Sequence, residues 1–340
     1  MGYESVTFQR WWPQFGGKKT PEIIDAIAVI MEHETAGDPI SGCKWTLKTT
    51  AKIAQQLKRA GIRVSAKTVG RLLKQMKFSL RMNLKCLESG LRNPPDPHVR
   101  DQQFRYIHSQ IRNYVAQGLP VISVDTKSRE LIGPFHQSGH KWSQEPIKVL
   151  DHDFPSDSKG VAMPYGIYDL SRNEGFVCVG TSRDTSKFAV DSIRMWWSKA
   201  GSSRYPDADR LLILADCGGS NGYRTRLWKH QLQIAFCNRF RLEVKVCHYP
   251  PGSSKWNPIE HRMFSFISSN WAGQPLLDYE TVLKFIRTTK TTAGLKIRAF
   301  LNKRLYLKGI RISDRQMKKI ALKRYTLRPN WNYSICPSKM

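Results

Sequence analysis

The sequence predicts an α/β fold, in which a mixed sheet flanked by helices follows a small all-α helix-turn-helix region. Two observations support this fold class. Beyond residue 119, short uninterrupted apolar runs such as 211–215 alternate with segments of helical periodicity, and such runs are typical of strands buried on both faces. Residues 44–92, by contrast, fit two short amphipathic helices.

The amino-terminal segment, residues 1–43, is predicted to be only partly helical. Pro21 to Met31 carries isoleucines at the helical period, with Thr20 suited to the N-cap and Pro21 to the first helical position. Residues 1–20 show no pattern that assigns them a structure.

Residues 44–92 are predicted to form a helix-turn-helix that binds DNA. They hold thirteen Lys and Arg against one acidic residue, and helices are expected over about 51–60 and 66–76, joined by a turn that contains Gly61. Ser65 suits the N-cap of the second helix. The alternative is a basic helical pair that is only a solvated face. The residues expected to contact DNA are Arg63, Lys67, Thr68, Arg71 and Lys74.

A proline-rich linker and a helix, residues 93–118, precede the largest predicted domain, residues 119–275. The elements expected in that domain are strand 120–127, its hairpin partner 129–135, strands 165–170 and 175–181, a helix from Asp184 or Thr185 to Lys199, strand 211–216, helix 223–236 capped by Ser220 or Asn221, strand 242–247 and a helix from Asn257. A meander followed by alternating strands and helices is typical of a ribonuclease-H-like domain. A Rossmann fold is disfavoured because the glycines follow a late strand.

Three carboxylates occupy places where this sheet would bring them together. Asp125 and Asp216 each end a strand, and Glu260 falls in the first turn of the helix that Asn257 and Pro258 begin. Taken singly, each has a simpler interpretation, as an Asp that ends a strand or a Glu that stabilises a helix start. Together, three close carboxylates repel one another unless cations compensate, which favours two Mg²⁺ or Mn²⁺ ions and phosphoryl transfer.

Four polar residues beside these carboxylates are candidates for holding a substrate phosphate or orienting a carboxylate. The alternative is that each is a local cap or a surface residue. They are Asn221, Lys255, Asn257 and His261.

The charge of the chain indicates a polyanionic partner. Its formal net charge is +28, from 55 Lys and Arg against 27 Asp and Glu, and nucleic acid is the partner that such an excess favours. The carboxyl-terminal region, residues 276–340, is itself basic, and we expect it to contact the DNA backbone. No apolar stretch is long enough to span a membrane, and none of the seven cysteines forms a CxxC pair. A cytoplasmic, nucleoid-associated protein is therefore expected.

Several motifs resemble those of the DDE transposases of bacterial insertion sequences, and most of all the group with the Rhodopirellula-type DDE domain. The stretches that carry the resemblance are Val121-Ile-Ser-Val-Asp-Thr-Lys127, Tyr165-Gly-Ile-Tyr-Asp169, Gly218-Gly-Ser-Asn-Gly222 and Ser253-Ser-Lys-Trp-Asn257 through Phe264-Ser-Phe-Ile-Ser268. The Asn257-Pro-Ile-Glu260 motif is also similar to that of mariner-like transposases.

The resemblance implies a ribonuclease-H-like fold, a catalytic triad of Asp125, Asp216 and Glu260, and divalent metal. It also implies hydrolysis at element ends, strand transfer into target DNA, and a homo-oligomer that brings two ends together. Residues 1–20 depart from the family pattern, so this copy is expected to be shortened or out of register there. The rival functions are a nuclease of the same fold without strand transfer and an inactive, transposase-derived DNA-binding protein.

Overall fold

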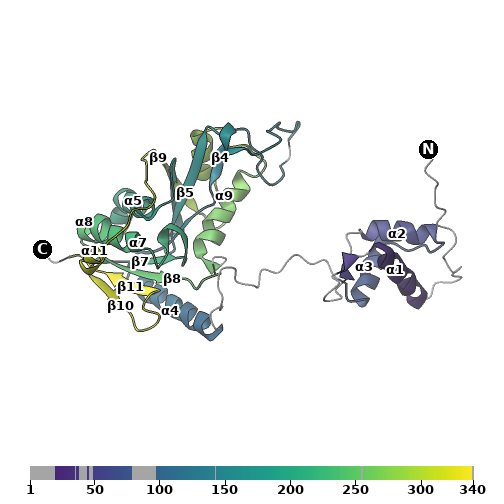
Figure 1. The fold of residues 1–340 in the computed structure, drawn as a ribbon, viewed down its shortest axis with the longest axis horizontal. Helices are drawn as coiled ribbons and strands as arrows, with labels where there is room; N and C mark the ends of the chain where they lie inside the picture. The colour runs from purple at the N-terminus through teal and green to yellow at the C-terminus, as the bar shows by residue number, and fades with distance from the viewer. Residues whose placement is uncertain are drawn as a thin grey trace. The chain divides into compact units, whose positions relative to one another are not determined.

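The computed structural model describes residues 20–34, 36–37, 44–45, 49–78, 97–141, 143–253 and 256–338. The chain divides into two compact units, residues 1–86 and 87–340 (Figure 1). The predictions for residues 1–19, for the linker at 93–96 and for Lys255 lie outside the described residues. No helix in the described ranges is long and apolar enough to cross a membrane.

In the first unit, the described residues form three helices and a short antiparallel pair of strands. The elements are α1 (Thr20–Glu34), β1 (Ala36–Gly37), β2 (Lys44–Trp45), α2 (Thr50–Arg59) and α3 (Ala66–Gln75). Buried apolar side chains of all three helices form one core, which comprises Ala26, Ile27, Ile30, Ile53, Leu57, Val69 and Leu72. The sequence predicted each helix, and the packing shows that α1 shares one core with α2 and α3.

A tight turn joins α2 to α3. Gly61 adopts a φ of +83°, which favours glycine, and the Ile62 N–H donates to the Leu57 carbonyl at 2.8 Å. The Ser65 hydroxyl accepts a hydrogen bond from the Thr68 N–H at 3.1 Å, so Ser65 is the predicted N-cap of α3. Local sequence chemistry therefore fixes where both helices end and begin.

In the described part of the second unit, nine strands form one mixed sheet. They are β3 (Val121–Thr126), β4 (Glu130–Ile132), β5 (Gly160–Asp169), β6 (Glu174–Gly180), β7 (Arg210–Ala215), β8 (Glu243–His248), β9 (Lys296–Asn302), β10 (Leu322–Arg324) and β11 (Asn332–Ile335). β3, β5 and β6 form an antiparallel meander, and β7 and β8 continue parallel to β3. This meander followed by crossover strands confirms the predicted ribonuclease-H-like class.

Helices cover both faces of the sheet (Figure 1). They are α4 (Pro97–Ala116), α5 (Ser186–Trp196), α6 (Ser202–Arg204), α7 (Arg226–Gln231), α8 (Asn238–Phe240), α9 (Ser265–Asn270), α10 (Tyr279–Thr288) and α11 (Asp314–Lys318). The side chains of β3 alternate between the faces: Ile122 and Val124 belong to the core that α5 and α7 share, whereas Val121 belongs to the core under α4. Both faces of β3 are buried, as its continuous apolar run predicts.

The prediction that residues 129–135 form a hairpin with the first strand is wrong. β4 pairs with the start of β5, whereas β3 pairs with its end, where Asp125 lies opposite Gly166. The Lys127 N–H continues this pairing by donating to the Pro164 carbonyl at 2.9 Å. The chain therefore runs onward along the long strand β5 after β3, instead of turning back on itself.

Residues 276–340 contribute to the same sheet, although the sequence alone did not place them there. β9 lies parallel to β6, and β11 lies antiparallel to β8, with β10 beyond it. The buried residues of β11 include Tyr333 and Ile335, which belong to the core under α5 and α7. This basic region is therefore part of the same sheet and core as residues 119–275.

Candidate active site

The strand register places Asp125 and Asp216 side by side. β3 and β7 are parallel, and their last paired residues are Val124 and Ala215. The next residue on each strand is an Asp, and neighbouring strands lie about 4.8 Å apart. Both carboxylates therefore stand at the carboxyl edge of the two central strands, where open α/β sheets bind ligands.

Glu260 reaches the same edge from a helix. Its N–H donates to the Asn257 carbonyl at 3.1 Å, so the helical segment begins where the sequence predicts. Glu260 opens a π-helical segment that continues into α9, and the buried Met263 and Phe264 hold that segment against the sheet. The charge of Glu260 raises the pKa of both Asp125 and Asp216, so the three carboxylates lie within electrostatic reach of one another. We call these three residues the carboxylate edge.

Burial and mutual repulsion make the negative charges of this edge costly. Burial raises the pKa of Asp125 to about 8, and the charge of Asp216 adds to the shift, whereas the Thr126 N–H, 2.7 Å from Asp125 Oδ1, opposes it. Burial also raises the pKa of Asp216 to about 6 and raises that of Glu260, which Lys127 and His261 partly offset. The neighbouring protein cations therefore leave the three charges undercompensated.

Asn257 connects the three elements that carry the carboxylates. Its side chain is fully buried, accepts a hydrogen bond from the Ser123 hydroxyl and donates to Asp216 Oδ1 at 3.1 Å. Its own carbonyl receives the Glu260 N–H. A residue expected to orient a carboxylate or to act as a local cap therefore links β3, the end of β7 and the start of the Glu260 helix.

A neutral histidine supports the backbone of Asp216. The Nδ1–H of His248 donates to the Asp216 carbonyl at 2.8 Å, and its Nε2 accepts from the Tyr333 hydroxyl at 3.1 Å. Trp228 Nε1 donates to the same hydroxyl at 2.9 Å, which completes the chain of hydrogen bonds. Burial lowers the pKa of His248 to about 4, so the ring is uncharged near neutral pH. This support was not predicted from the sequence, because Tyr333 lies on β11, far from His248 in the chain.

A fourth carboxylate, Asp184, approaches the same edge from between β6 and α5. Its charge raises the pKa of Asp125, and burial raises its own pKa, with the Ser220 and Thr126 hydroxyls opposing that rise. Its buried Oδ1 has no hydrogen-bond partner in the described ranges. Asp184 and Thr185 were both predicted as possible N-caps of α5, and the cap is Thr185, whose hydroxyl accepts a hydrogen bond from the Phe188 N–H at 3.2 Å. The sequence feature that could have indicated a role for Asp184 is its place between a predicted strand and a predicted helix.

The sequence matches the Rhodopirellula transposase DDE domain over residues 26–337. The chain belongs to this family. It is therefore a DDE transposase, an enzyme of DNA transposition, as the motifs around Asp125, Asp216 and Glu260 predicted. No curated protein matches the sequence at a significant level.

Solved structures of Mos1, a mariner transposase, are similar to this chain at low identity. The paired-end complex with the left transposon end is 14% identical, covers 81% of this chain and 72% of its own, and has a TM-score of 0.41. The match to the strand transfer complex is 15% identical, covers 81% of this chain and 71% of the Mos1 chain, and has a TM-score of 0.43. The paired-end complex with Mg is 14% identical over 83% and 74%, also with a TM-score of 0.43.

Two other polar residues predicted near the site of the transposase have different surroundings. Asn221 is buried and accepts a hydrogen bond from the Tyr165 hydroxyl at 2.9 Å. Neither Ser220 nor Asn221 caps the next helix, because the chain turns through Gly222 first and α7 begins after Thr225, which corrects the predicted cap. His261 is exposed beside Glu260. The hydrogen bond of Asn221 therefore ties the loop after Asp216 to strand β5.

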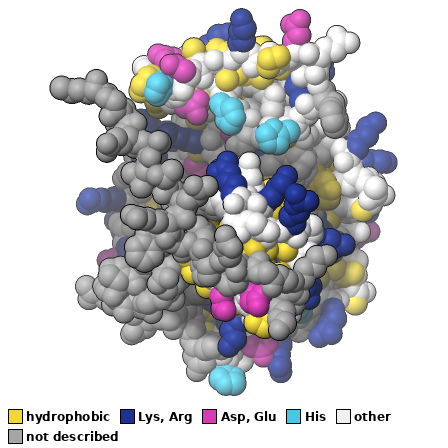
Figure 2. All heavy atoms as spheres, turned by 90° about the vertical axis from the view of Figure 1, so that its right-hand side faces the viewer, with side chains coloured by type: hydrophobic (Ala, Val, Ile, Leu, Met, Phe, Trp, Pro, Cys, Tyr) yellow, Lys and Arg dark blue, Asp and Glu magenta, His cyan; other side chains and the backbone are white. Residues whose placement is uncertain are grey.

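The predicted DNA contacts belong to the other unit of the transposase. Arg63, Lys67, Arg71 and Lys74 are exposed, whereas Thr68 is half-buried and its hydroxyl lies 2.9 Å from that of Ser65. We call the exposed four, of which Lys67, Arg71 and Lys74 lie on α3 and Arg63 in the turn before it, the basic face of α3. Lys and Arg side chains also recur across the surface drawn in Figure 2, whereas Asp and Glu gather in a few places.

The donor chemistry of the carboxylate edge fits a hard divalent cation. Its donors are half-buried carboxyl oxygens whose negative charges the neighbouring cations do not fully compensate, and carboxylate oxygen is the ligand type that Mg²⁺ and Mn²⁺ prefer. Among the residues that the structure describes, no group of three or more His, Cys, Asp or Glu stands close enough together to hold one ion. The fit therefore rests on the chemistry of the donors.

Proposed function

We propose that this transposase hydrolyses a phosphodiester bond at the ends of its element and then joins the freed strand to target DNA. Asp125, Asp216 and Glu260 would hold two Mg²⁺ or Mn²⁺ ions for both steps. The proposal rests on the register that sets Asp125 beside Asp216 at a sheet edge, with charges that neighbouring cations do not balance. Membership of the DDE family supports it independently.

In the proposed reaction, the chain holds the carboxylates in fixed positions. Asp125 lies on β3 and Asp216 directly follows β7, two central strands whose apolar residues are buried, and this burial restricts the movement of both carboxylates. Asn257 holds the Asp216 carboxylate through Oδ1, and His248 holds its backbone. When held there, two such ions would supply activation of the attacking oxygen and stabilisation of the leaving oxygen. The same arrangement serves water in hydrolysis and a 3′-hydroxyl in strand transfer.

The basic face of α3 is proposed to bind the element ends. Lys67, Arg71 and Lys74 are spaced i, i+4 and i+7, which places them on one side of the helix. Thr68 adds a hydroxyl at the amino end of α3, the end that enters the major groove in helix-turn-helix proteins. A homo-oligomer would bring two such units to two ends, because one carboxylate edge acts on one end at a time.

The deciding experiment is cleavage of a labelled element-end duplex in Mg²⁺ by the wild-type chain and by Asp216→Asn. This substitution keeps the shape of the side chain and removes one charge of the carboxylate edge. We expect the wild-type chain to cut and the variant to bind DNA without cutting. Equal cutting by both proteins would overturn the assignment of Asp216.

A second reaction separates a transposase that joins strands from a nuclease. A pre-cut element end with a free 3′-hydroxyl is incubated with a supercoiled target plasmid, and joined products are counted. We expect joined products that disappear with Asp216→Asn. Cutting of the first substrate without any joining would favour the nuclease, and binding without either reaction would favour an inactive DNA-binding protein.

A further inference from the structure

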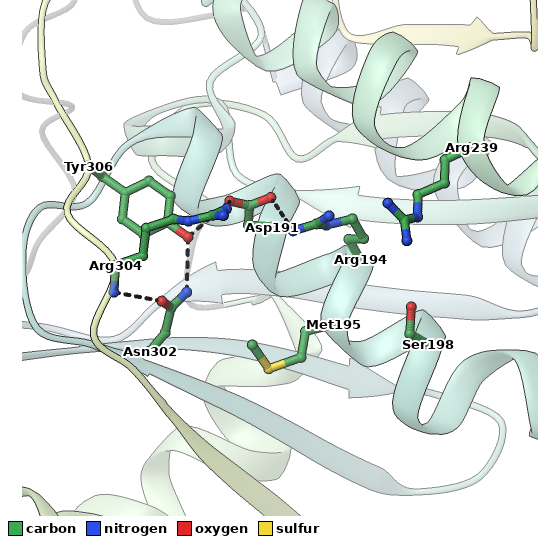
Figure 3. A pocket seen from close by; sticks show the side chains of 8 residues that line it. All are labelled: Asp191, Arg194, Met195, Ser198, Arg239, Asn302, Arg304 and Tyr306. Atoms are coloured by element: carbon green, nitrogen blue, oxygen red, sulfur yellow. Dashed lines mark hydrogen bonds and ion pairs between the residues drawn. The ribbon is translucent and has the colours of Figure 1, made fainter.

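A pocket lined by arginines lies on the helical face of the catalytic unit, apart from the carboxylate edge. Its volume is about 300 Å³, and three separated segments supply its walls (Figure 3). α5 and its extension contribute Asp191, Arg194, Met195 and Ser198, α8 contributes Arg239, and the end of β9 with the following segment contributes Asn302, Arg304 and Tyr306. We call this site the arginine pocket.

The carboxylate in the wall of the pocket is fully engaged. Asp191 Oδ1 pairs with Arg194 at 3.0 Å, and its Oδ2 accepts from Arg304 at 3.1 Å and from the Tyr306 hydroxyl at 3.0 Å. Asn302 braces this cluster by donating to the Tyr306 hydroxyl at 2.9 Å. Asp191 therefore fixes the positions of two arginines and balances only one of the two charges.

Arg239 adds a further cation that no carboxylate balances. Its guanidinium lies over the ring of its neighbour Phe240, 5.7 Å from the centroid, and it has no acidic partner in the described part of the chain. Figure 3 shows Arg239 extending toward Arg194 and Ser198, with no interaction drawn between it and another side chain. Among the lining residues, three guanidinium groups thus face one carboxylate, so the pocket carries a net positive charge.

We propose that the arginine pocket binds a phosphate group. Guanidinium groups suit phosphate oxygens because they donate paired hydrogen bonds in a fixed plane. The aromatic ring in the wall, Tyr306, is only 4% exposed, so it offers no free face on which a base stacks. The group recognised is therefore phosphate rather than a base, either in the backbone of DNA or as free inorganic phosphate.

The position of the pocket favours DNA as the source, a step that rests on the proposed function. α5 begins at Ser186, whose hydroxyl donates to the Ser220 carbonyl in the loop after Asp216 at 2.6 Å. At about 1.5 Å per residue, Arg194 lies roughly 12 Å along the helix from that start. A strand of duplex DNA rises about 3.4 Å per nucleotide, so this distance corresponds to roughly three or four nucleotides.

The test compares the wild-type chain with Arg239→Gln and Ser198→Glu. Arg239 is exposed and has no acidic partner, and Ser198 is exposed at the rim, so both variants are expected to keep the melting temperature of the wild-type chain. Fluorescence anisotropy with labelled duplex DNA is measured over a series of salt concentrations. Losing one phosphate contact is expected to weaken binding about threefold to tenfold and to reduce the salt slope by about one.

Arg112→Gln in α4 is the matched control, because it removes one exposed arginine outside the pocket. It should change DNA affinity less than Arg239→Gln does. A second arm measures the rise in melting temperature that inorganic phosphate gives to each protein. Loss of that rise in Arg239→Gln, with DNA binding unchanged, would assign the pocket to free phosphate.

The proposal is overturned if Arg239→Gln and Ser198→Glu match the wild-type chain in both arms. Failure of the proposed function has a different signature, because it appears as cutting that survives Asp216→Asn or as a wild-type chain that does not bind DNA. In that case the phosphate arm still reports on the pocket by itself.

Discussion

Asp125 and Asp216 lie half-buried beside each other at the ends of two strands, whereas Lys67, Arg71 and Lys74 stand exposed along helix α3. Because little water surrounds them, the two carboxylates repel each other strongly, and each raises the free energy of ionising the other. The exposed cations are screened by water and salt and act almost independently. One region is thus suited to chemistry that depends on a few atoms, and the other to binding spread over many weak contacts.

The largest expected effect is on the carboxylate edge. Asp125→Asn and Glu260→Gln should each slow cleavage of element-end DNA on the order of 10³-fold, the size seen when one group that stabilises a transition state is removed. DNA affinity should stay close to that of the wild-type chain. Single-turnover cleavage in Mg²⁺ measures the rate, and the exposed Asp157→Asn is the control that should cut normally. A fully active Asp125→Asn would contradict the comparison.

The next effect concerns the residue that links the elements of this edge. Asn257→Ala should lower the free energy of unfolding by about 1–3 kcal/mol, because the buried Ser123 hydroxyl loses its acceptor. It should also slow cleavage, since Asp216 loses the hydrogen bond that orients it. Urea unfolding measures the stability. Ser123→Ala is the comparison: if the two residues act as a pair, the double variant should cost less than the sum of the single variants.

The metal-free protein should show the cost of burying Asp125 in its pH dependence. The folded pKa is raised above the unfolded one, so the folded state binds the proton more tightly, and stability falls as pH rises toward about 8. His248 acts in the opposite direction, because its pKa is lowered on folding, but its effect fades above about pH 6.5, where the ring of the unfolded chain becomes increasingly neutral as well.

Thermal unfolding in a chelator between about pH 6.5 and pH 8 checks this sign. The melting temperature of the wild-type chain should fall across that range, and Asp125→Asn should flatten the fall and melt higher at pH 8. Added Mg²⁺ should raise the melting temperature of the wild-type chain more than that of the variant. A wild-type melting temperature that rises with pH in chelator would show that folding does not raise the pKa of Asp125.

The smallest effects belong to the basic face of α3. Arg71→Gln should weaken binding to element-end DNA about threefold to tenfold and reduce the salt slope by about one, with cleavage at saturating protein unchanged. Lys58→Gln, which removes an exposed charge from the last turn of α2, is the matched control. A loss of cleavage larger than the loss of binding would mean that the two regions are not separable in this way.

Local patterns predicted a large part of this protein. The apolar runs that end at Asp125 and Asp216 are strands, and Ser65 and Thr185 cap the helices that follow them, because these features depend on residues a few positions apart. Since both strands end in an acid at the same sheet edge, the sequence also predicted where the carboxylates would meet. The family motifs added the expectation of transposition, which the match over residues 26–337 bears out.

Tertiary structure decided which segments become partners. β4 pairs with β5 instead of β3, and β11 reaches back to β8, which brings Tyr333 to His248. Asp184 and the arginine pocket likewise depend on residues that the fold assembles from distant segments. The physical reason is that these contacts gain their free energy from burying side chains far apart in the chain. No local pattern predicts such pairs. The period of a helix and the end of a strand, by contrast, depend on residues that are close together in the chain.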